Sequence, residues 1–385
     1  MVDFGYSKDQ EMIRKSVRKF LEKECPMDNV RALKTDAKGY DVKVWKKMVD
    51  LGFVGMAVSE AYDGMGGEYL ELMIFMEEAG RNLLPSPYFT SVVLCGLPIE
   101  RFGSAAQKES CLPAIADGQI WSLALMEEAA DYEAQHINLA AVREGDVYTL
   151  NGTKLFVPFA AAAEKLLVAA RTQAGEDLQA GITFFIVDSD ADGVSMEMIP
   201  TAAGDQRYEI RFDKVVVPAE NIIGRADGGW EIVEYLLLYA AVLKCAEMSG
   251  GAQAVLEMTR RYAAERIQFD KPIGSMQAIQ HRLSNAFIGV QALKNLVYEA
   301  AWYLNAGLPR PDLVSMAKVK ANTVFQNTCI EGITIHGAIG FTEEMDVGMY
   351  HLRTKAMEFD LGGSEFHRER IMRELEQQVP DYLSL

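Results

Sequence analysis

A short block in the last third of the chain places a cation, an aromatic ring and amide side chains within a few residues of one another. Residues 266–273 read Arg-Ile-Gln-Phe-Asp-Lys-Pro-Ile, and two further glutamines follow at Gln277 and Gln280. A guanidinium offers a rigid fork of donors that suits a diphosphate, and a phenyl ring offers a flat apolar face to a nucleotide ring or ribose. The spacing of Arg266, Phe269 and the amides therefore indicates a nucleotide-like ligand. Either residue alone is more typical of a surface cation beside a core aromatic ring.

Helical periodicity predicts that this block follows directly on a helix. Apolar residues recur at helical spacing over 230–265, the helix should end near Glu265, and Pro272 cannot continue it. Further helical periodicity covers residues 276–304, 311–335 and 364–377. The last third of the chain is therefore predicted to be a helical bundle.

The rest of the chain divides into a helical and a β-rich block. Ser7 and Gln10 form a capping-box signature before an apolar periodic stretch, so the first block is expected to be helical. In the middle block, Asn151-Gly152 between β-favouring residues predicts a hairpin turn, and residues 208–212 alternate as a strand does. This order predicts an α+β fold. Its expected domains are an N-terminal helical domain at 1–119, a small β-barrel or sandwich at 120–228, and a C-terminal four-helix bundle at 229–385.

Composition narrows the possible partners. The net charge of −17 argues against nucleic acid and anionic membranes, because both require a basic surface. Five scattered cysteines form no Cys-x-x-Cys pair, and the five histidines show no metal-ligand spacing. The longest apolar run, Tyr235–Leu243, is far below the ~20 residues that a membrane span needs. We expect a cytoplasmic protein with reduced thiols and no metal site.

The block at 266–280 resembles the flavin-diphosphate contact of the acyl-CoA dehydrogenase family, whose pattern there is Arg-x-x-Phe-x-x-x-Ile/Leu-x-x-x-Gln. Other segments resemble that family in the same order along the chain: Gly52–Gly55, Glu60–Gly67, Tyr148–Lys154, Val215–Gly224 and His336–Phe341. The last of these is similar to a glycine loop that approaches the flavin of a neighbouring subunit. Glycine in such a loop permits close backbone approach.

This resemblance implies an FAD-dependent α,β-dehydrogenation of an acyl-CoA thioester. A carboxylate removes the α-proton, the flavin takes the β-hydrogen as hydride, and an electron-transferring flavoprotein accepts the electrons. The implied cofactor contacts are Arg266, Gln268, Phe269, Ile273, Gln277, Gly337, Gly340, Phe156 and Ser364. Such chemistry requires a carboxylate with a raised pKa beside the substrate.

The chain departs from the family pattern at the catalytic base. The family's Glu-Gly-Thr-Ser-like turn matches residues 360–366, so Leu361 or Gly362 falls at the base position, and neither carries a proton. Some relatives place the glutamate on the preceding long helix, where this chain has Ala240. In the β block, Thr-Glu-Pro-x-x-Gly-Ser-Asp is replaced by the acidic stretch 126–133, and an aromatic-x-Thr motif becomes Phe156-Val-Pro. Carboxylates accept hydrogen bonds and repel a diphosphate, so the flavin cradle also departs from the pattern.

These departures suggest that the chain is the non-catalytic subunit of an α2β2 heterotetramer with a paralogous acyl-CoA dehydrogenase subunit. Its Arg266 block would contact a flavin that is held mainly by that partner. The first alternative is a self-sufficient homotetramer with a displaced base, either Glu247, on a helix that is apolar nearly all round, or Asp360. Glu247 could equally pair with Lys244 at i,i+3, and Asp360 could form a turn or cap. The second alternative is a non-enzymatic acyl-CoA-binding or structural paralogue.

Overall fold

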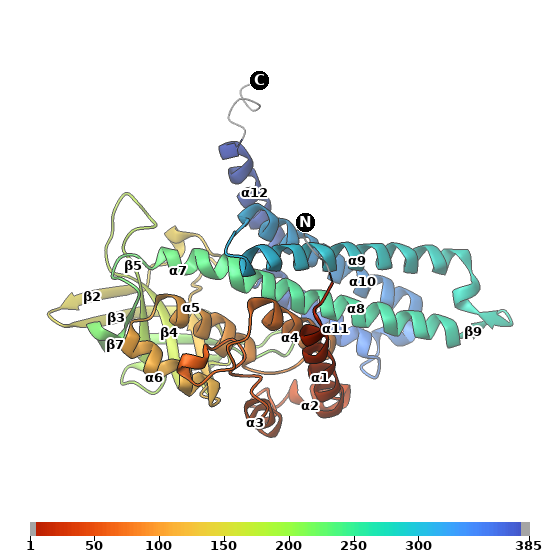
Figure 1. Ribbon diagram of the computed structural model, residues 1–385, viewed down its shortest axis with the longest axis horizontal. Coiled ribbons are helices and arrows are strands. Elements are labelled where there is room, and N and C mark those ends of the chain that lie inside the picture. Colours follow the sequence, from red (N-terminus) through yellow and green to blue (C-terminus); the bar gives the residue numbers. More distant parts are fainter. Residues whose placement is uncertain (1–4, 379–385) are drawn as a thin grey trace. The chain divides into compact units, whose positions relative to one another are not determined.

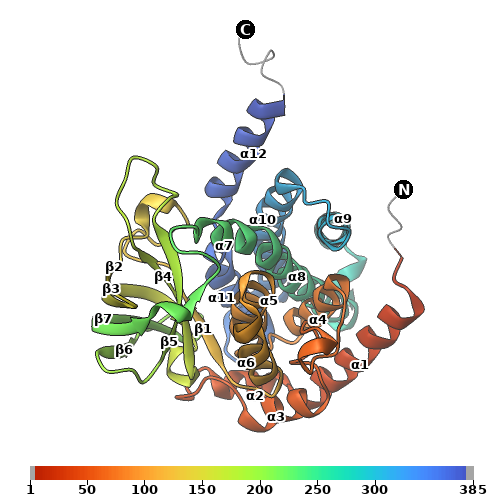
Figure 2. The same cartoon turned by 60° about the vertical axis from the view of Figure 1, so that its left-hand side comes forward.

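The structure is a computed structural model that describes residues 5–378, and its chain divides into two compact units (Figures 1 and 2). The helical unit comprises the residues up to Arg31, Glu68–Leu84 and the residues from Ala241 on. The β-containing unit comprises Ala32–Gly67 and Pro85–Ala240. Both units are therefore assembled from segments that are distant in the sequence. Within residues 5–378, no helix is both long and apolar enough to cross a membrane.

Long helices packed side by side form the helical unit (Figure 1). Their bounds are α1 Lys8–Glu24, α4 Tyr69–Arg81, α8 Ala241–Glu265, α9 Gln277–Asn305, α10 Pro311–His336, α11 Asp346–Phe359 and α12 Ser364–Gln378. The predicted capping box begins α1, with Ser7 Oγ accepting from the Gln10 N–H at 3.1 Å and Gln10 Oε1 accepting from the Ser7 N–H at 3.0 Å. The helix α2, Met27–Leu33, follows α1.

Two glycines allow α4 and α8 to touch backbone to backbone. A Cβ on Gly80 would lie 1.8 Å from the Glu247 carbonyl oxygen, and a Cβ on Gly250 would lie 1.8 Å from the Glu77 carbonyl oxygen. No side chain fits at such a distance, so both positions require glycine. This crossing seats α8 against α4 close to Glu247.

The β-containing unit holds one mixed sheet, and within the described residues eight strands join it in the order β6-β7-β3-β2-β4-β5-β8, with β1 on β4. Their bounds are β1 Trp121–Ala124, β2 Ala140–Glu144, β3 Val147–Pro158, β4 Lys165–Arg171, β5 Ile182–Asp188, β6 Val194–Met198, β7 Arg207–Pro218 and β8 Ile222–Ile223. The unit's helices are α3 Val42–Asp50, α5 Leu97–Phe102, α6 Ala105–Ala116 and α7 Trp230–Tyr235, with π-helical turns at Phe89–Gly96 and Leu236–Ala240. The apolar runs of β4 and β5 are buried on both faces and form the core of the sheet.

The predicted hairpin turn at Asn151-Gly152 is wrong. Strand β3 runs straight through this dipeptide, and the chain reverses earlier, between β2 and β3, where Gly145 has φ +64°. A register shift between Leu150 and Gly152 marks a bulge, and Gly152 has φ +142°. Asn151 Oδ1 accepts from the Lys214 N–H at 2.9 Å across this bulge. Asn151-Gly152 thus forms a bulge in β3, because the long strand β7 pairs with β3 on both sides of this dipeptide.

The C-terminal helices agree closely with the helices predicted from the sequence, except that one of them was not predicted. The stretches predicted at 276–304, 311–335 and 364–377 correspond to α9, α10 and α12 within about two residues. Helix α11 was not predicted. Its buried residues Val347, Tyr350, Thr354 and Met357 recur at helical spacing, but charged residues between them weaken the apolar signal.

Candidate functional site

The block at 266–273 forms an exposed hairpin, called here the clasp hairpin. Helix α8 ends at Glu265 as predicted, and the short strands β9 (Ile267–Gln268) and β10 (Lys271–Pro272) then pair antiparallel. Phe269 and Asp270 form the turn with φ of +54° and +60°. A bulky residue with positive φ is uncommon. Here that backbone conformation places the phenyl ring of Phe269 in the exposed turn of the hairpin. The Phe269 side chain is 83% exposed.

The structure brings several predicted cofactor residues together around this hairpin. Arg266 and Gln268 are exposed on it, Ile273 is half-buried at its end, and Gln277 is the exposed first residue of α9. The Ile273 N–H donates to the Arg266 carbonyl at 2.9 Å, which closes the hairpin at its base. Within residues 5–378 the Arg266 guanidinium makes no ion pair, so its donors remain available for a ligand.

The predicted glycine loop lies at a helix end tied to the base of the clasp hairpin. Gly337 directly follows α10, has φ +70°, and a Cβ there would meet nothing within 4 Å. Gly340 differs, because a Cβ there would lie 2.8 Å from the Ile333 carbonyl oxygen, so it serves packing. His336 stacks on Tyr262 with ring centroids 4.3 Å apart, and the Tyr262 carbonyl accepts from the Arg266 N–H. This stack connects the two predicted cofactor segments.

Phe156 belongs to the β-containing unit. It lies at a second register shift of β3 against β7, between Lys154 and Val157, with φ +56° and a half-buried side chain. The Pro158 carbonyl accepts a hydrogen bond from Ser122 Oγ at 2.5 Å. A positive φ at a bulky residue is uncommon, and bulges and strained backbone of this kind are frequent next to functional sites.

The acidic stretch at 126–133 is partly neutralised within its own unit. Glu127 Oε1 accepts from Lys154 Nζ at 2.6 Å and from the N–H groups of Asn138 and Leu139. Lys154 is fully buried, and burial lowers its pKa to about 8 although Glu127 opposes that shift. Asp131 pairs with His136 at 2.7 Å. Glu127 is thus half-buried, and its contacts with Lys154, Asn138 and Leu139 hold the loop in place.

The base region lies in the turn between α11 and α12, called here the α11–α12 turn (Asp360–Gly363). Leu361 is 2% exposed with φ +60° and offers no proton acceptor. Asp360 Oδ2 lies 3.5 Å from Lys244 Nζ, and the same ammonium donates to Glu247 Oε2 at 2.6 Å. Both candidate bases thus share one buried cation. The ion pair between Lys244 and Glu247 at i,i+3 is present. It was the alternative, in the sequence analysis, to Glu247 acting as the catalytic base.

Three polar side chains of α10 bond to residues on either side of this turn, and sequence reasoning missed all three and their partner histidine. Lys318 Nζ donates to the Glu358 carbonyl at 2.9 Å, and Asn322 Nδ2 donates to Ser364 Oγ at 3.1 Å. His367 bonds to Ser315 Oγ through Nδ1. Burial lowers the pKa of Lys318 to about 8 and that of His367 to about 3. A lysine in the apolar periodic stretch 311–335 was the one available signal.

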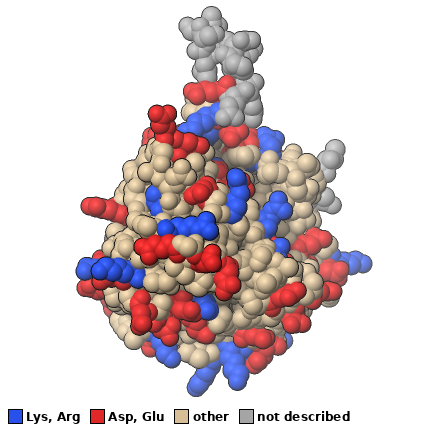
Figure 3. Space-filling model, turned by 90° about the vertical axis from the view of Figure 1, so that its left-hand side faces the viewer, with Lys and Arg blue, Asp and Glu red and all other residues tan. Residues whose placement is uncertain are grey.

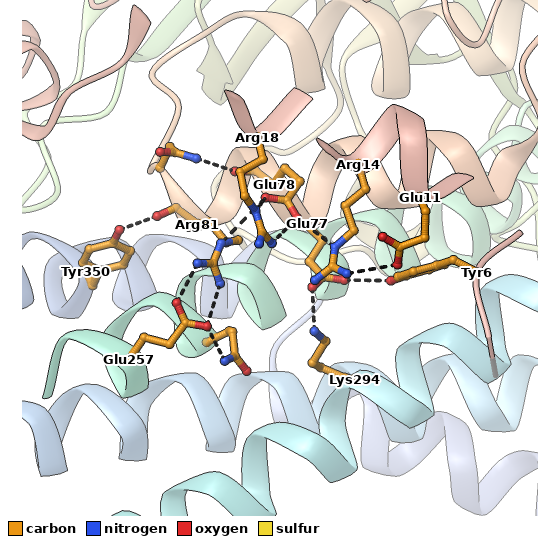
Figure 4. Close-up of polar contacts among 12 residues, drawn as sticks. Tyr6, Glu11, Arg14, Arg18, Glu77, Glu78, Arg81, Glu257, Lys294 and Tyr350 are labelled. Carbon is orange, nitrogen blue, oxygen red and sulfur yellow. Dashed lines mark hydrogen bonds and ion pairs between the residues drawn. The ribbon is translucent and has the colours of Figure 1, made fainter. Parts of the chain in front are cut away.

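A separate charged cluster fixes α4 against α1 and α8 (Figure 4). Glu78 is fully buried and accepts from Arg18 Nη2 at 2.6 Å and from Arg14 Nε at 3.2 Å. Arg81 Nη2 donates to Glu257 Oε2 at 2.7 Å. Since each of these charges has a partner of opposite sign, the cluster is a packing element of the helical unit.

Three models of one protein family together match most of the described chain. The N-terminal domain model of acyl-CoA dehydrogenases matches residues 7–119, the middle domain model matches 122–215, and the C-terminal domain model matches 227–376. The fold class predicted from the sequence is confirmed: a helical N-terminal part, a middle β domain and a helical C-terminal part.

Two curated relatives illustrate the range of that family. The probable acyl-CoA dehydrogenase YngJ of Bacillus subtilis is 31% identical and covers 97% of this chain and 100% of its own length. The caffeyl-CoA reductase-Etf complex subunit CarC of Acetobacterium woodii is also 31% identical, over 89% of this chain and 91% of its own.

Two solved structures have the same fold. Butyryl-CoA dehydrogenase from Megasphaera elsdenii superposes with a TM-score of 0.91 at 29% identity, covering 97% of this chain and 100% of that chain. A chain of the ChsE4-ChsE5 complex from Mycobacterium tuberculosis superposes with a TM-score of 0.87 at 27% identity, covering 97% and 99% respectively.

Proposed function

The chain belongs to the acyl-CoA dehydrogenase family, whose cofactor is FAD, and from this membership we propose that it is the non-catalytic, flavin-clasping subunit of an α2β2 acyl-CoA dehydrogenase. The partner would be a paralogous chain with an intact base. Together they would carry out the α,β-dehydrogenation of an acyl-CoA thioester.

One observation carries this proposal: the clasp hairpin is free for a ligand while the base region is satisfied internally. Arg266 and Phe269 are exposed on a hairpin whose backbone specifically displays them. In contrast, Leu361 falls at the base position, and Lys244 binds both Glu247 and Asp360. A chain that acted as a complete enzyme would need the opposite arrangement at its base.

The residues of the clasp hairpin fit the chemistry of FAD. The Arg266 fork suits a diphosphate, the Phe269 ring suits stacking on a flat ring, and the open space at Gly337 admits a close approach of the backbone. When bound, FAD supplies the acceptor for the β-hydride. The chain's own part is to hold the cofactor and to exclude water from it, while the partner's carboxylate takes the α-proton.

The relatives support the choice of partners. One curated relative is named as a subunit of an Etf complex, which favours an electron-transferring flavoprotein as the electron acceptor. One structural neighbour is a two-component complex, which favours a heteromeric assembly. Basic side chains lie among acidic ones on the face in Figure 3. The five cysteines are free and buried, in keeping with the cytoplasmic location that we propose.

Purification alone and with the partner tests this proposal. We expect the lone chain to retain little or no FAD and the co-expressed assembly to retain FAD and to oxidise acyl-CoA. A yellow, active homotetramer of the lone chain would refute the subunit role. An assembly that binds acyl-CoA but no FAD would favour the non-enzymatic paralogue.

A self-sufficient enzyme with a displaced base is the second candidate, because Glu247 and Asp360 meet at one buried cation beside the expected base position. In that case Glu247→Gln or Asp360→Asn would abolish turnover by a homo-oligomer. If turnover persists in Glu247→Gln, Glu247 is not the base.

A further inference from the structure

A groove of about 530 Å³ lies between helices α8 and α9, which run side by side (Figure 1). Its lining on α8 ends at Arg260, and its lining on α9 begins at Leu283, so neither the clasp hairpin nor Gln277 belongs to it. Sites for small molecules occupy roughly 300–1,000 Å³. The groove is therefore large enough for a ligand other than the cofactor.

Four apolar side chains line the groove. Leu256 is buried and Leu283 is half-buried, whereas Phe287 and Ile288 on α9 are 54% and 64% exposed. Two consecutive large apolar side chains in water contribute little to the stability of their own chain, and exposed apolar patches commonly mark binding sites. A hydrocarbon chain that lies in the groove would cover these side chains and remove apolar surface from water.

The charge left unpaired in the groove, among the described residues, is positive. Arg260 is exposed, and within residues 5–378 its guanidinium forms no ion pair. Glu257 also lines the groove, but its carboxylate accepts from Arg81 Nη2 at 2.7 Å and from Gln253 Nε2 at 2.6 Å. Ser284, exposed on α9, offers a hydroxyl donor. A guanidinium can bind a carboxylate through two parallel hydrogen bonds, so the groove suits an anionic head group.

We propose that this groove binds a free medium-chain fatty acid as its carboxylate. The hydrocarbon chain lies against the four apolar side chains, and the carboxylate binds Arg260, with the Ser284 hydroxyl as a second donor. From Gln253 to Arg260 helix α8 rises about 10 Å at ~1.5 Å per residue, a length that suits a chain of about eight carbons. This inference goes beyond the proposed function and does not depend on it, because no residue of the clasp hairpin or the α11–α12 turn lines the groove.

Calorimetric titration of the full chain with octanoate, both alone and in its assembly, tests this site. We expect one saturable site per chain, with a dissociation constant that falls about 4-fold for each CH₂ added from hexanoate to octanoate. Octylamine has the same length of chain but a cationic head group. It should not bind, because the Arg260 guanidinium repels it.

The paired variants Arg260→Gln and Arg261→Gln separate the proposed contact from a general loss of positive charge. Both arginines are exposed at neighbouring positions of α8, but only Arg260 lines the groove. We expect Arg260→Gln to weaken octanoate binding about 10- to 100-fold, as for charge-assisted hydrogen bonds. Arg261→Gln is the matched control and should weaken it less than about 2-fold. Thermal unfolding checks that each variant is folded.

Three outcomes would overturn the inference: no saturable binding of octanoate, equal losses in Arg260→Gln and Arg261→Gln, or octylamine bound as tightly as octanoate. Binding to the lone chain that is lost in the assembly would also overturn it, because the groove would then be a contact between subunits. The ligand series uses the unaltered chain, so it decides the question even if a variant does not fold. The FAD content of the chain is a separate measurement, and failure of the proposed function leaves this site unaffected.

Discussion

The clasp hairpin and the α11–α12 turn are both short connections in the helical unit, yet one exposes its apolar side chain and the other buries it. The clasp hairpin leaves Phe269 83% exposed on a backbone that a bulky residue rarely adopts. The α11–α12 turn buries Leu361, and its neighbours His367 and Lys318 donate to the carbonyls around it.

This contrast separates residues that stabilise the fold from residues that are kept for a ligand. The contacts of the α11–α12 turn are explained by the chain's own stability, since each buried polar group has a partner. An exposed phenyl ring held at positive φ stabilises nothing within its own chain, so its explanation must lie in a cofactor or partner.

The largest effect of a single substitution is expected at the cation that Glu247 and Asp360 share. Lys244→Met removes a buried ammonium from between two carboxylates, so we expect a loss of about 3 kcal/mol in the free energy of unfolding. Urea denaturation of the variant measures this loss. The double variant Lys244→Met with Glu247→Gln should regain part of it, and a change below about 0.5 kcal/mol in the single variant would mean that the cluster does not stabilise the fold.

Acid should destabilise the α11–α12 turn through His367. Burial lowers the pKa of His367 from 6.5 to about 3 in the folded chain, so between these values the unfolded chain binds the additional proton. Stability is therefore unaffected above pH 6.5 and falls as the pH drops toward 3, by about 1.4 kcal/mol per pH unit. Denaturation curves across this range should be less steep in pH for His367→Gln. Equal slopes would contradict a neutral, buried histidine.

Arg266→Ala should weaken FAD binding without affecting the fold. Loss of charge-assisted hydrogen bonds to a diphosphate corresponds to an affinity about 10- to 100-fold lower. The unfolding temperature should be unchanged, because the side chain is exposed. Arg266→Lys is the control and should fall between, since an ammonium keeps the charge but not the fork. A large loss of thermal stability in Arg266→Ala would assign the arginine to folding instead.

The smallest effect is expected at the tip of the clasp hairpin. Phe269→Ser should lower FAD affinity about 3- to 10-fold by removing one stacking surface, with stability changed by less than about 0.5 kcal/mol. Phe287→Ser, at another exposed phenyl ring on α9, is the matched control and should leave FAD affinity unchanged. Equal effects from both substitutions would show that exposed rings on this unit serve assembly rather than the cofactor.

Local signals in the sequence predicted most of the fold. The Ser7–Gln10 capping box, the end of α8 at Glu265 and the bounds of α9, α10 and α12 all depend on residues close in sequence. The Asn151-Gly152 prediction failed because β7, some 60 residues away, converts the dipeptide into a bulge. Tertiary pairing of this kind overrides local turn preference.

The residue types of the candidate site could be predicted from the sequence, but the environment of each side chain could not. The sequence named Arg266 and Phe269, yet only the structure places them on an exposed hairpin connected to Gly337 through a Tyr262–His336 stack. For Glu247 the sequence allowed either a role as catalytic base or an ion pair with Lys244, and the ion pair is present. The bonds from α10 to α11 and α12 join residues up to 52 positions apart, a sequence separation at which spacing carries no signal.

The flavin content of the purified chain tests the central claim most directly. Absorbance of the flavin per chain, with native mass spectrometry of the assembly, should give no FAD for the lone chain. The co-purified heterotetramer should hold one FAD for each paralogous chain. A homotetramer of the lone chain with FAD bound to every copy would contradict the account.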